Sequence, residues 1–225
     1  MESLAFLRTL QLTDSFFPVG AFAYSDGLET AAAAGRVHDG ASLDEWMNHF
    51  IESVFIPCEG LAVLQCMDAL STDDFEKVIR IDEELSAIRP AGEVRRASTL
   101  IGRRLLSVYR SICADEHFHA LARSLPHGNS AAAYAVVFFH EGLTAHEAVM
   151  AFGYSRLSGI VSAGLRLISM GQQEGQMLLT KALHRLPSAA DEILQRANEP
   201  LRSFSPFLDI QQMNHQYVYS RMFRS

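Results

Sequence analysis

The stretch "TAHEAVMAFGYSRLSGIVSAGLRLISM", residues 144 to 170, predicts the centre of the fold. Thr144 and Glu147 have the spacing of a capping box, in which each side chain bonds the backbone N–H of the other residue at a helix start. The residues that follow are apolar on nearly every side, a pattern typical of a helix in the middle of a bundle. Small residues such as Gly159 let another backbone come close. Packing within the chain and packing against a second subunit explain them equally well.

The segments around this helix also favour helices. Apolar residues at helical spacing and helix-start residues predict helices over residues 43 to 54, 73 to 88, 92 to 112 and 188 to 197. The run "YAVVFF", residues 134 to 139, has the composition of a strand, although a buried helix explains it equally well. No fixed repeat or long linker divides the chain. We expect an all-α, single-domain helical bundle of about ten helices over residues 1 to 204, followed by an apolar C-terminal tail, residues 205 to 225.

Composition limits the kinds of partner. The chain has 225 residues, a hydrophobic content of 48% and a net charge of -7, so we expect a folded protein whose main partner is not nucleic acid. No basic region precedes the first apolar residues, and Arg156 and Arg166 interrupt the longest apolar run. We therefore expect neither a signal peptide nor a membrane span. The three cysteines are odd in number and fit reduced thiols, which indicates a cytoplasmic protein.

Residues that could carry chemistry are scarce. Glu116 and His119 have the spacing that puts two metal ligands on one helical face, but no second pair of this kind occurs, so we expect no metal site. Neither of the two lysines, Lys77 and Lys181, follows a phosphate-binding loop. We find no catalytic signature and expect no enzyme. A helical metal- or cofactor-dependent enzyme with an unrecognised site is the alternative.

One charged pattern is distinctive. Arg96, Arg103 and Arg110 recur every seven residues, with Arg95 and Arg104 beside them. On a helix this spacing drifts by only about 20° per step, which predicts a basic stripe. A solvated face paired with nearby acidic residues explains the stripe, and a docking face for an acidic partner is the alternative.

Four blocks of sequence resemble the UreF family of urease accessory proteins. They are "LQLTDSFFPVGAFAYSDGLE" at residues 10 to 29, "GEVRRASTLIGRRLL" at 92 to 106, "LSGIVSAGLRLISMGQQEGQ" at 157 to 176, and "YSRMFRS" at 219 to 225. The blocks follow the family's order across nearly the whole chain. Departures are mild, because they are confined to positions such as Gln216 and Met222.

The resemblance implies a largely helical homodimer without catalysis of its own. Such a chaperone joins UreD, called UreH in some organisms, and the GTPase UreG, and the assembly loads nickel into the urease apoprotein. Nickel and GTP then act through the assembled complex, and this chain binds no cofactor. A small-residue helix face that includes Gly159 is our candidate for the dimer contact.

The resemblance also draws attention to the aromatic loop at residues 14 to 29. We expect Phe16 and Phe17 to be buried under the first helix, and Asp26 with Glu29 to start the next helix as a capping box. We expect three residues to be exposed near the surface that meets UreG: Tyr24, Ser25 and Glu29.

The tail, residues 205 to 225, is too apolar for a free chain end. Its own bundle or a partner must supply a groove, and we favour a partner because aromatic residues and arginine are typical of interface centres. We predict that the tail becomes ordered on UreD. Its expected contacts are Tyr219, Arg221 and Phe223 as anchors, and Arg224 at the rim.

Overall fold

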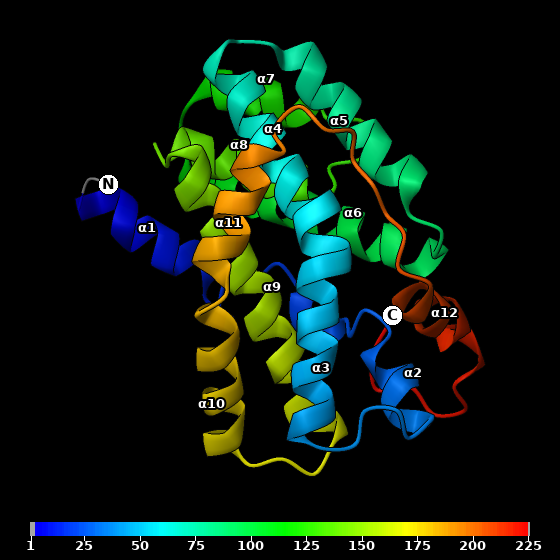
Figure 1. Cartoon of the computed structure of the whole chain (residues 1–225). Helices are drawn as coiled ribbons and strands as arrows, with labels where there is room; N and C mark the ends of the chain where they lie inside the picture. Colours follow the sequence, from blue (N-terminus) through cyan, green and yellow to red (C-terminus); the bar gives the residue numbers. More distant parts are fainter. Residues whose placement is uncertain (1–2, 225) are drawn as a thin grey trace.

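The computed structural model describes residues 3 to 224, and these residues form helices and no strand (Figure 1). The expected all-α bundle is confirmed. The α-helices are α1 (Ser3–Thr13), α2 (Leu28–Ala33), α3 (Gly40–Phe50), α4 (Gly60–Ser71), α5 (Phe75–Ile88), α6 (Gly92–Ile112), α7 (Glu116–Ser124), α8 (Ser130–His140), α9 (Ala145–Leu167), α10 (Gln172–Leu183), α11 (Leu186–Gln195) and α12 (Pro206–Asn214). Two short 3₁₀ helices, η1 (Ala21–Ala23) and η3 (His215–Tyr217), lie near the two ends of the chain.

Helix α9 is central, as its sequence predicts, and it contacts α1, α2, α3, α4, α8, α10 and α11. Its capping box is present, because Thr144 N donates to Glu147 Oε2 at 2.9 Å and Glu147 N donates to Thr144 Oγ1 at 3.3 Å. A Cβ atom at Gly153 would lie 2.6 Å from Leu186, so neighbouring helices approach α9 closely there. Gly159 differs, because no atom of the described residues lies within 4 Å of the position its Cβ would take. Packing within the chain therefore does not explain this glycine.

The strand-like run at residues 134 to 139 is the buried helix α8. Residues 130 to 138 of α8 are all buried, and α8 packs between α4 and α6. A helix enclosed in this way needs no polar face, so helical periodicity is absent from its sequence. The β-branched valines cost it only a little helix propensity, which tertiary packing easily offsets.

Most predicted helix boundaries agree with the structure, and α6 spans the expected 92 to 112. The predicted capping box of Asp26 and Glu29 is wrong. Helix α2 instead begins at Leu28 after Gly27, which has a left-handed φ of 90° that glycine adopts without strain. The carboxylate of Asp26 bonds Arg156, and that of Glu29 bonds the C-terminal tail.

A nine-residue π-helix, η2 (Ile51–Glu59), joins α3 to α4. Pro57 lies inside it, and the wider turns of a π-helix tolerate a residue that has no backbone N–H. By length and composition the joined helix Gly40–Ser71 could cross a membrane, but 78% of its apolar window is buried inside the protein. Buried core helices pass the same test.

The tail lies on the bundle. Figure 1 shows α12 beside α2, close to the C-terminal end of the chain, and α1 on the opposite side of the molecule. Leu208, His215 and Phe223 are buried. The bundle therefore supplies much of the groove that we expected a partner to supply.

Candidate functional site

Glu29 in α2 connects the two ends of the chain. Its Oε1 accepts the N–H of Met222 at 2.5 Å, and its Oε2 accepts the N–H of Phe223 at 3.2 Å. Oε2 also lies 2.8 Å from His215 Nε2. The Glu29 residue is only 5% exposed, and a buried carboxylate is stable only when donors surround it. The tail supplies those donors, so Glu29 fixes the path of the tail.

His215 extends this contact to α6. The residue is fully buried, and its second ring nitrogen, Nδ1, lies 3.0 Å from Glu93 Oε2. A neutral imidazole donates from only one nitrogen, so the ring pairs fully with both carboxylates only when both nitrogens carry protons. Arg221 lies 3.9 Å from the other oxygen of Glu93. The tail is therefore tied to α2 and to α6.

Arg166 of α9 holds the aromatic loop against the tail. Its guanidinium group lies 3.7 Å from the ring centre of Phe22 and 4.1 Å from that of Phe223. Its Nη1 also donates to the carbonyl oxygen of Phe22 at 3.0 Å. Burial lowers the pKa of Arg166 below its ordinary value. Arg224 N donates to Ala23 O at 2.8 Å, so the loop and the tail form one unit.

The structure brings together the two sets of residues that we expected to bind different partners. The predicted exposure of Ser25 and Glu29 is wrong, because both are buried, and Tyr24 is partly buried. Phe223 is buried too, against its own chain. Phe17 is buried as expected, but Phe16 is 93% exposed. The sequence shows which residues are polar or aromatic, but it does not show that the loop and the tail cover each other.

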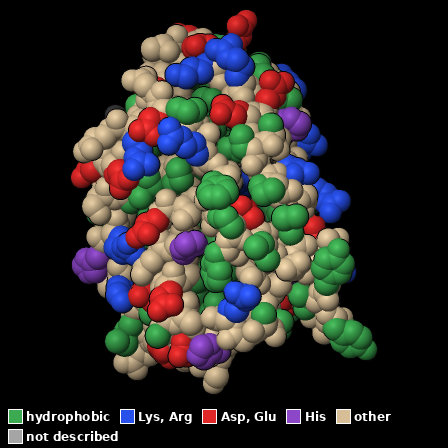
Figure 2. All heavy atoms as spheres, turned by 45° about the vertical axis from the view of Figure 1, so that its right-hand side comes forward, with side chains coloured by type: hydrophobic (Ala, Val, Ile, Leu, Met, Phe, Trp, Pro, Cys, Tyr) green, Lys and Arg blue, Asp and Glu red, His purple; other side chains and the backbone are tan. Residues whose placement is uncertain are grey.

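The exposed side chains of this unit form what we call the terminal surface. Its members are Phe22, Tyr217, Tyr219, Arg221, Met222 and Arg224. Tyr219 is fully exposed. Figure 2 brings the side with α6 and α12 forward, and hydrophobic side chains gather over its centre and lower right. Large apolar side chains grouped on a protein surface are typical of an interaction site.

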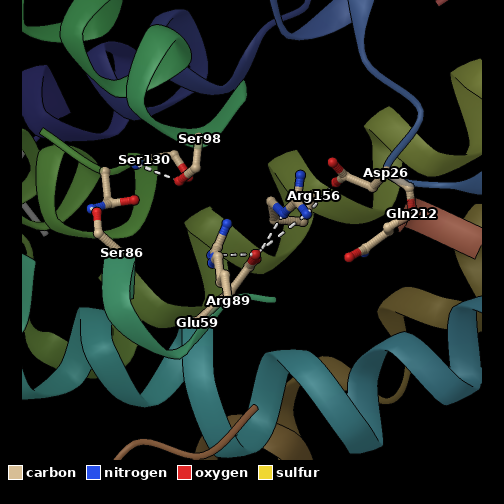
Figure 3. Close-up of polar contacts among 9 residues, drawn as sticks. Asp26, Glu59, Ser86, Arg89, Ser98, Ser130, Arg156 and Gln212 are labelled. Carbon is tan, nitrogen blue, oxygen red and sulfur yellow. Dashed lines mark hydrogen bonds and ion pairs between the residues drawn. The ribbon is translucent and has the colours of Figure 1, made fainter. Parts of the chain in front are cut away.

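A second polar cluster lies inside the bundle, and we did not predict it. Figure 3 shows Glu59 between Arg89 and Arg156, with Asp26 on the other side of Arg156. Glu59 Oε1 accepts from Arg89 Nη2 at 2.8 Å, and Glu59 Oε2 accepts from Arg156 Nε at 2.8 Å. Asp26 Oδ2 accepts from Arg156 Nη2 at 2.5 Å. Arg156, a charged residue in the middle of the largely apolar α9 sequence, was the signal that could have revealed this cluster.

The interior cluster is electrically balanced, since two arginines face two carboxylates. Burial lowers the pKa of Arg156, but the charges of Asp26 and Glu59 outweigh burial, so the pKa lies above its ordinary value. Two cavities of about 30 and 40 Å³ border Arg156, and each has room for water. Every charge in the cluster has a partner of opposite sign, and each carboxylate accepts at least one arginine N–H.

The candidate metal pair does not extend to a full site. His119 Nδ1 lies 3.5 Å from Glu116 Oε1, and His119 Nε2 lies 2.9 Å from the carbonyl oxygen of Cys113. Between residues 3 and 224, no group of three or more His, Cys, Asp or Glu side chains is placed to hold a metal ion.

The fold and the terminal surface define an all-helical protein that exposes apolar side chains where its aromatic loop meets its C-terminal tail. A comparison with protein-family models matches residues 37 to 183 to UreF. The chain is 36% identical to the urease accessory protein UreF of Microcystis aeruginosa over the full length of both chains. It is 32% identical to UreF of an Arthrobacter species, covering 97% of this chain and 96% of the relative. For UreF of Streptococcus salivarius the identity is 30%, with coverage of 98% and 94%. The chain belongs to the UreF family of urease accessory proteins.

Proposed function

We propose that this protein is a scaffold that joins UreD, called UreH in some organisms, to the GTPase UreG for insertion of nickel into the urease apoprotein. The observation that carries the proposal is the terminal surface, where Phe22, Tyr217, Tyr219 and Met222 are all exposed in one unit. Exposed aromatic side chains beside arginine are the composition that interface centres favour. Membership of the UreF family supports the same role.

UreD is our candidate for the partner that covers the terminal surface. Tyr219 and Arg221 are the contact residues, with Arg224 at the rim. Phe223 has a different role from the one its sequence suggested, because its buried ring positions the tail. The tail is thus already docked on the bundle, and UreD adds a second covering to it.

We propose that UreG binds near the same joined loop and tail. Ser25 and Glu29 are buried, so they act on UreG by setting the path of the loop and the tail, while Tyr24 is partly exposed. The scaffold favours one nucleotide state of UreG and binds no nucleotide itself. Nickel is cargo that passes through the assembled complex, and the isolated chain holds no tight nickel site of its own.

The scaffold acts in the cytoplasm as a two-fold homodimer, the commonest symmetry among homo-oligomers. The exposed side of α9 around Gly159 is the proposed contact. Among residues 3 to 224, no atom lies within 4 Å of the position that a Cβ of this glycine would take, so a second subunit can approach the backbone there.

The test replaces Tyr219 by alanine in cells that carry urease, UreD and UreG but lack their own copy of this chain. Tyr219 is fully exposed and its side chain forms no hydrogen bond or ring contact in the described structure, so the variant keeps the stability of the parent. We expect loss of UreD co-purification and of urease activity. Met177→Ala, an exposed change on α10, is the control. Normal UreD recovery and urease activity in Tyr219→Ala, Arg221→Ala and the double variant would contradict the proposed docking role.

A further inference from the structure

Five arginines lie on the outward part of α6: Arg95, Arg96, Arg103, Arg104 and Arg110. All are exposed except Arg95, which is partly buried. Within the described residues 3 to 224, none of the five forms an ion pair. Eight other arginines do pair with carboxylates: Arg80, Arg89, Arg123, Arg156, Arg185, Arg196, Arg202 and Arg221. The reading in which nearby acidic residues neutralise the stripe is therefore wrong for these residues.

Carbonyl oxygens hold two of the exposed arginines in place. Arg103 donates from Nε to His127 O at 2.8 Å and from Nη2 to Pro126 O at 3.0 Å. Arg104 donates from Nε to Pro18 O at 3.2 Å. The loop that receives Arg103 is itself fixed, because Asp82 accepts the N–H groups of residues 127 to 129. These guanidinium groups are charged, oriented in advance and supplied with further N–H donors, which lowers the entropy lost on binding a carboxylate.

The spacing of the stripe fits one kind of partner. Arg96, Arg103 and Arg110 are seven residues apart, which is about 10.5 Å along a helix axis, and the row drifts by only about 20° per step. Leu100, 54% exposed, lies among them. A second helix that packs alongside α6 would meet the arginines with its own residues at seven-residue intervals, and would cover Leu100.

We propose that this face of α6 is a docking site for an acidic α-helix of a partner protein, with carboxylates repeated every seven residues. The chain as a whole carries a charge of -7. A nucleic acid long enough to extend past the stripe would therefore meet a negatively charged surface that repels it. A single acidic helix matches the stripe in length and charge. The site borders the terminal surface, because Glu93, one turn before Arg96, is tied to His215 and Arg221.

The direct test measures binding of a synthetic helical peptide to the full chain by fluorescence anisotropy. The matched peptide carries three glutamates at seven-residue spacing beside an apolar row, and a second peptide has the same composition in scrambled order. We expect the matched peptide to bind about tenfold more tightly than the scrambled one, and its affinity to fall as salt is added. Equal binding of the two peptides would overturn the proposal.

Two variants locate the site on α6. Arg96→Glu/Arg103→Glu/Arg110→Glu should weaken matched-peptide binding by at least about tenfold. Because Arg103 also fixes a loop, Arg96→Glu/Arg110→Glu keeps the test valid if the triple variant is unstable. The matched control, Arg80→Glu/Arg123→Glu/Arg202→Glu, makes the same change in net charge at arginines that already have acidic partners, and it should bind nearly as well as the parent.

The control also excludes general charge attraction. An equal loss in the control variant, or unchanged binding in both α6 variants, would overturn the proposal. Vesicles that contain phosphatidylserine test a membrane as the source of negative charge. If vesicles bind through Arg96 and Arg110 and the matched peptide does not bind, the proposed acidic helix is refuted, and a lipid surface is the partner of the stripe. The peptide assay contains neither UreD nor UreG, so its failure would leave the proposed scaffold function standing.

Discussion

Replacing Glu29 by alanine should release the C-terminal tail while leaving the bundle folded. Glu29 is the acceptor for two backbone N–H groups of the tail, those of Met222 and Phe223, and it faces His215. Alanine removes the acceptor and leaves the backbone N–H groups of Met222 and Phe223, and the facing ring nitrogen of His215, without this partner. Because these donors belong to the tail, the tail regains hydrogen bonds to water only by leaving its groove.

The magnitude follows from the kind of bond. A hydrogen bond to a charged group contributes about 1.5 to 3 kcal/mol, and the three bonds share one carboxylate, so we take about 3 kcal/mol for their combined loss. That free energy corresponds to an increase of about 150-fold in the population of the detached tail. Phe223 still packs on Arg166, which keeps the tail attached for part of the time.

Amide hydrogen exchange measured by mass spectrometry resolves this change by segment. In Glu29→Ala, peptides that cover residues 215 to 224 should exchange about 100-fold faster, while peptides from α8 keep the rate of the parent. The control is Glu76→Ala, because the Glu76 side chain is 90% exposed. Glu29→Gln keeps one acceptor oxygen and should give an intermediate rate. Parental exchange of the tail in Glu29→Ala would refute the assignment of Glu29 as its attachment point, and faster exchange throughout the chain would refute its local character.

Three further outcomes are expected. Arg156→Met leaves the buried Glu59 with Arg89 alone and the partly buried Asp26 with no arginine, and it should lower the free energy of unfolding by about 3 to 5 kcal/mol in urea titrations, whereas a loss below about 1 kcal/mol would contradict the pairing. Gly159→Leu adds a side chain in open space, so light scattering should show a stable monomer in place of a dimer, and an unchanged dimer would place the contact elsewhere. Cys58 and Cys66 should resist thiol reagents at neutral pH while Cys113 reacts, because burial raises the pKa of Cys58 to about 12 and that of Cys66 still further. Rapid labelling of all three in folded protein would contradict this burial.

The sequence was sufficient for elements whose signals are local. A capping box and a continuous apolar pattern located α9, and α6 follows from a regular amphipathic pattern. Residues 134 to 139 were ambiguous because a fully buried helix and a buried strand have the same composition. The contacts of α8 with α4 on one side and α6 on the other resolve the ambiguity in favour of a buried helix.

The site depended on contacts between distant residues, which sequence patterns do not contain. Glu29 looked like an exposed helix-start residue, yet it bonds Met222, nearly two hundred residues away. The sequence identified both the loop and the tail as unusual, and their side chains as suited to interaction. The sequence could not show that the loop and the tail bury each other, because their contact depends on how all the helices between them are arranged.

We propose that the loop and the tail form one docking surface. Hydrogen exchange of the full chain, alone and with purified UreD, tests it directly. We predict that UreD slows exchange in residues 20 to 29 and 215 to 224 together, and that Tyr219→Ala abolishes both effects. Protection of only one segment, or of neither, in a complex that forms normally would contradict the claim.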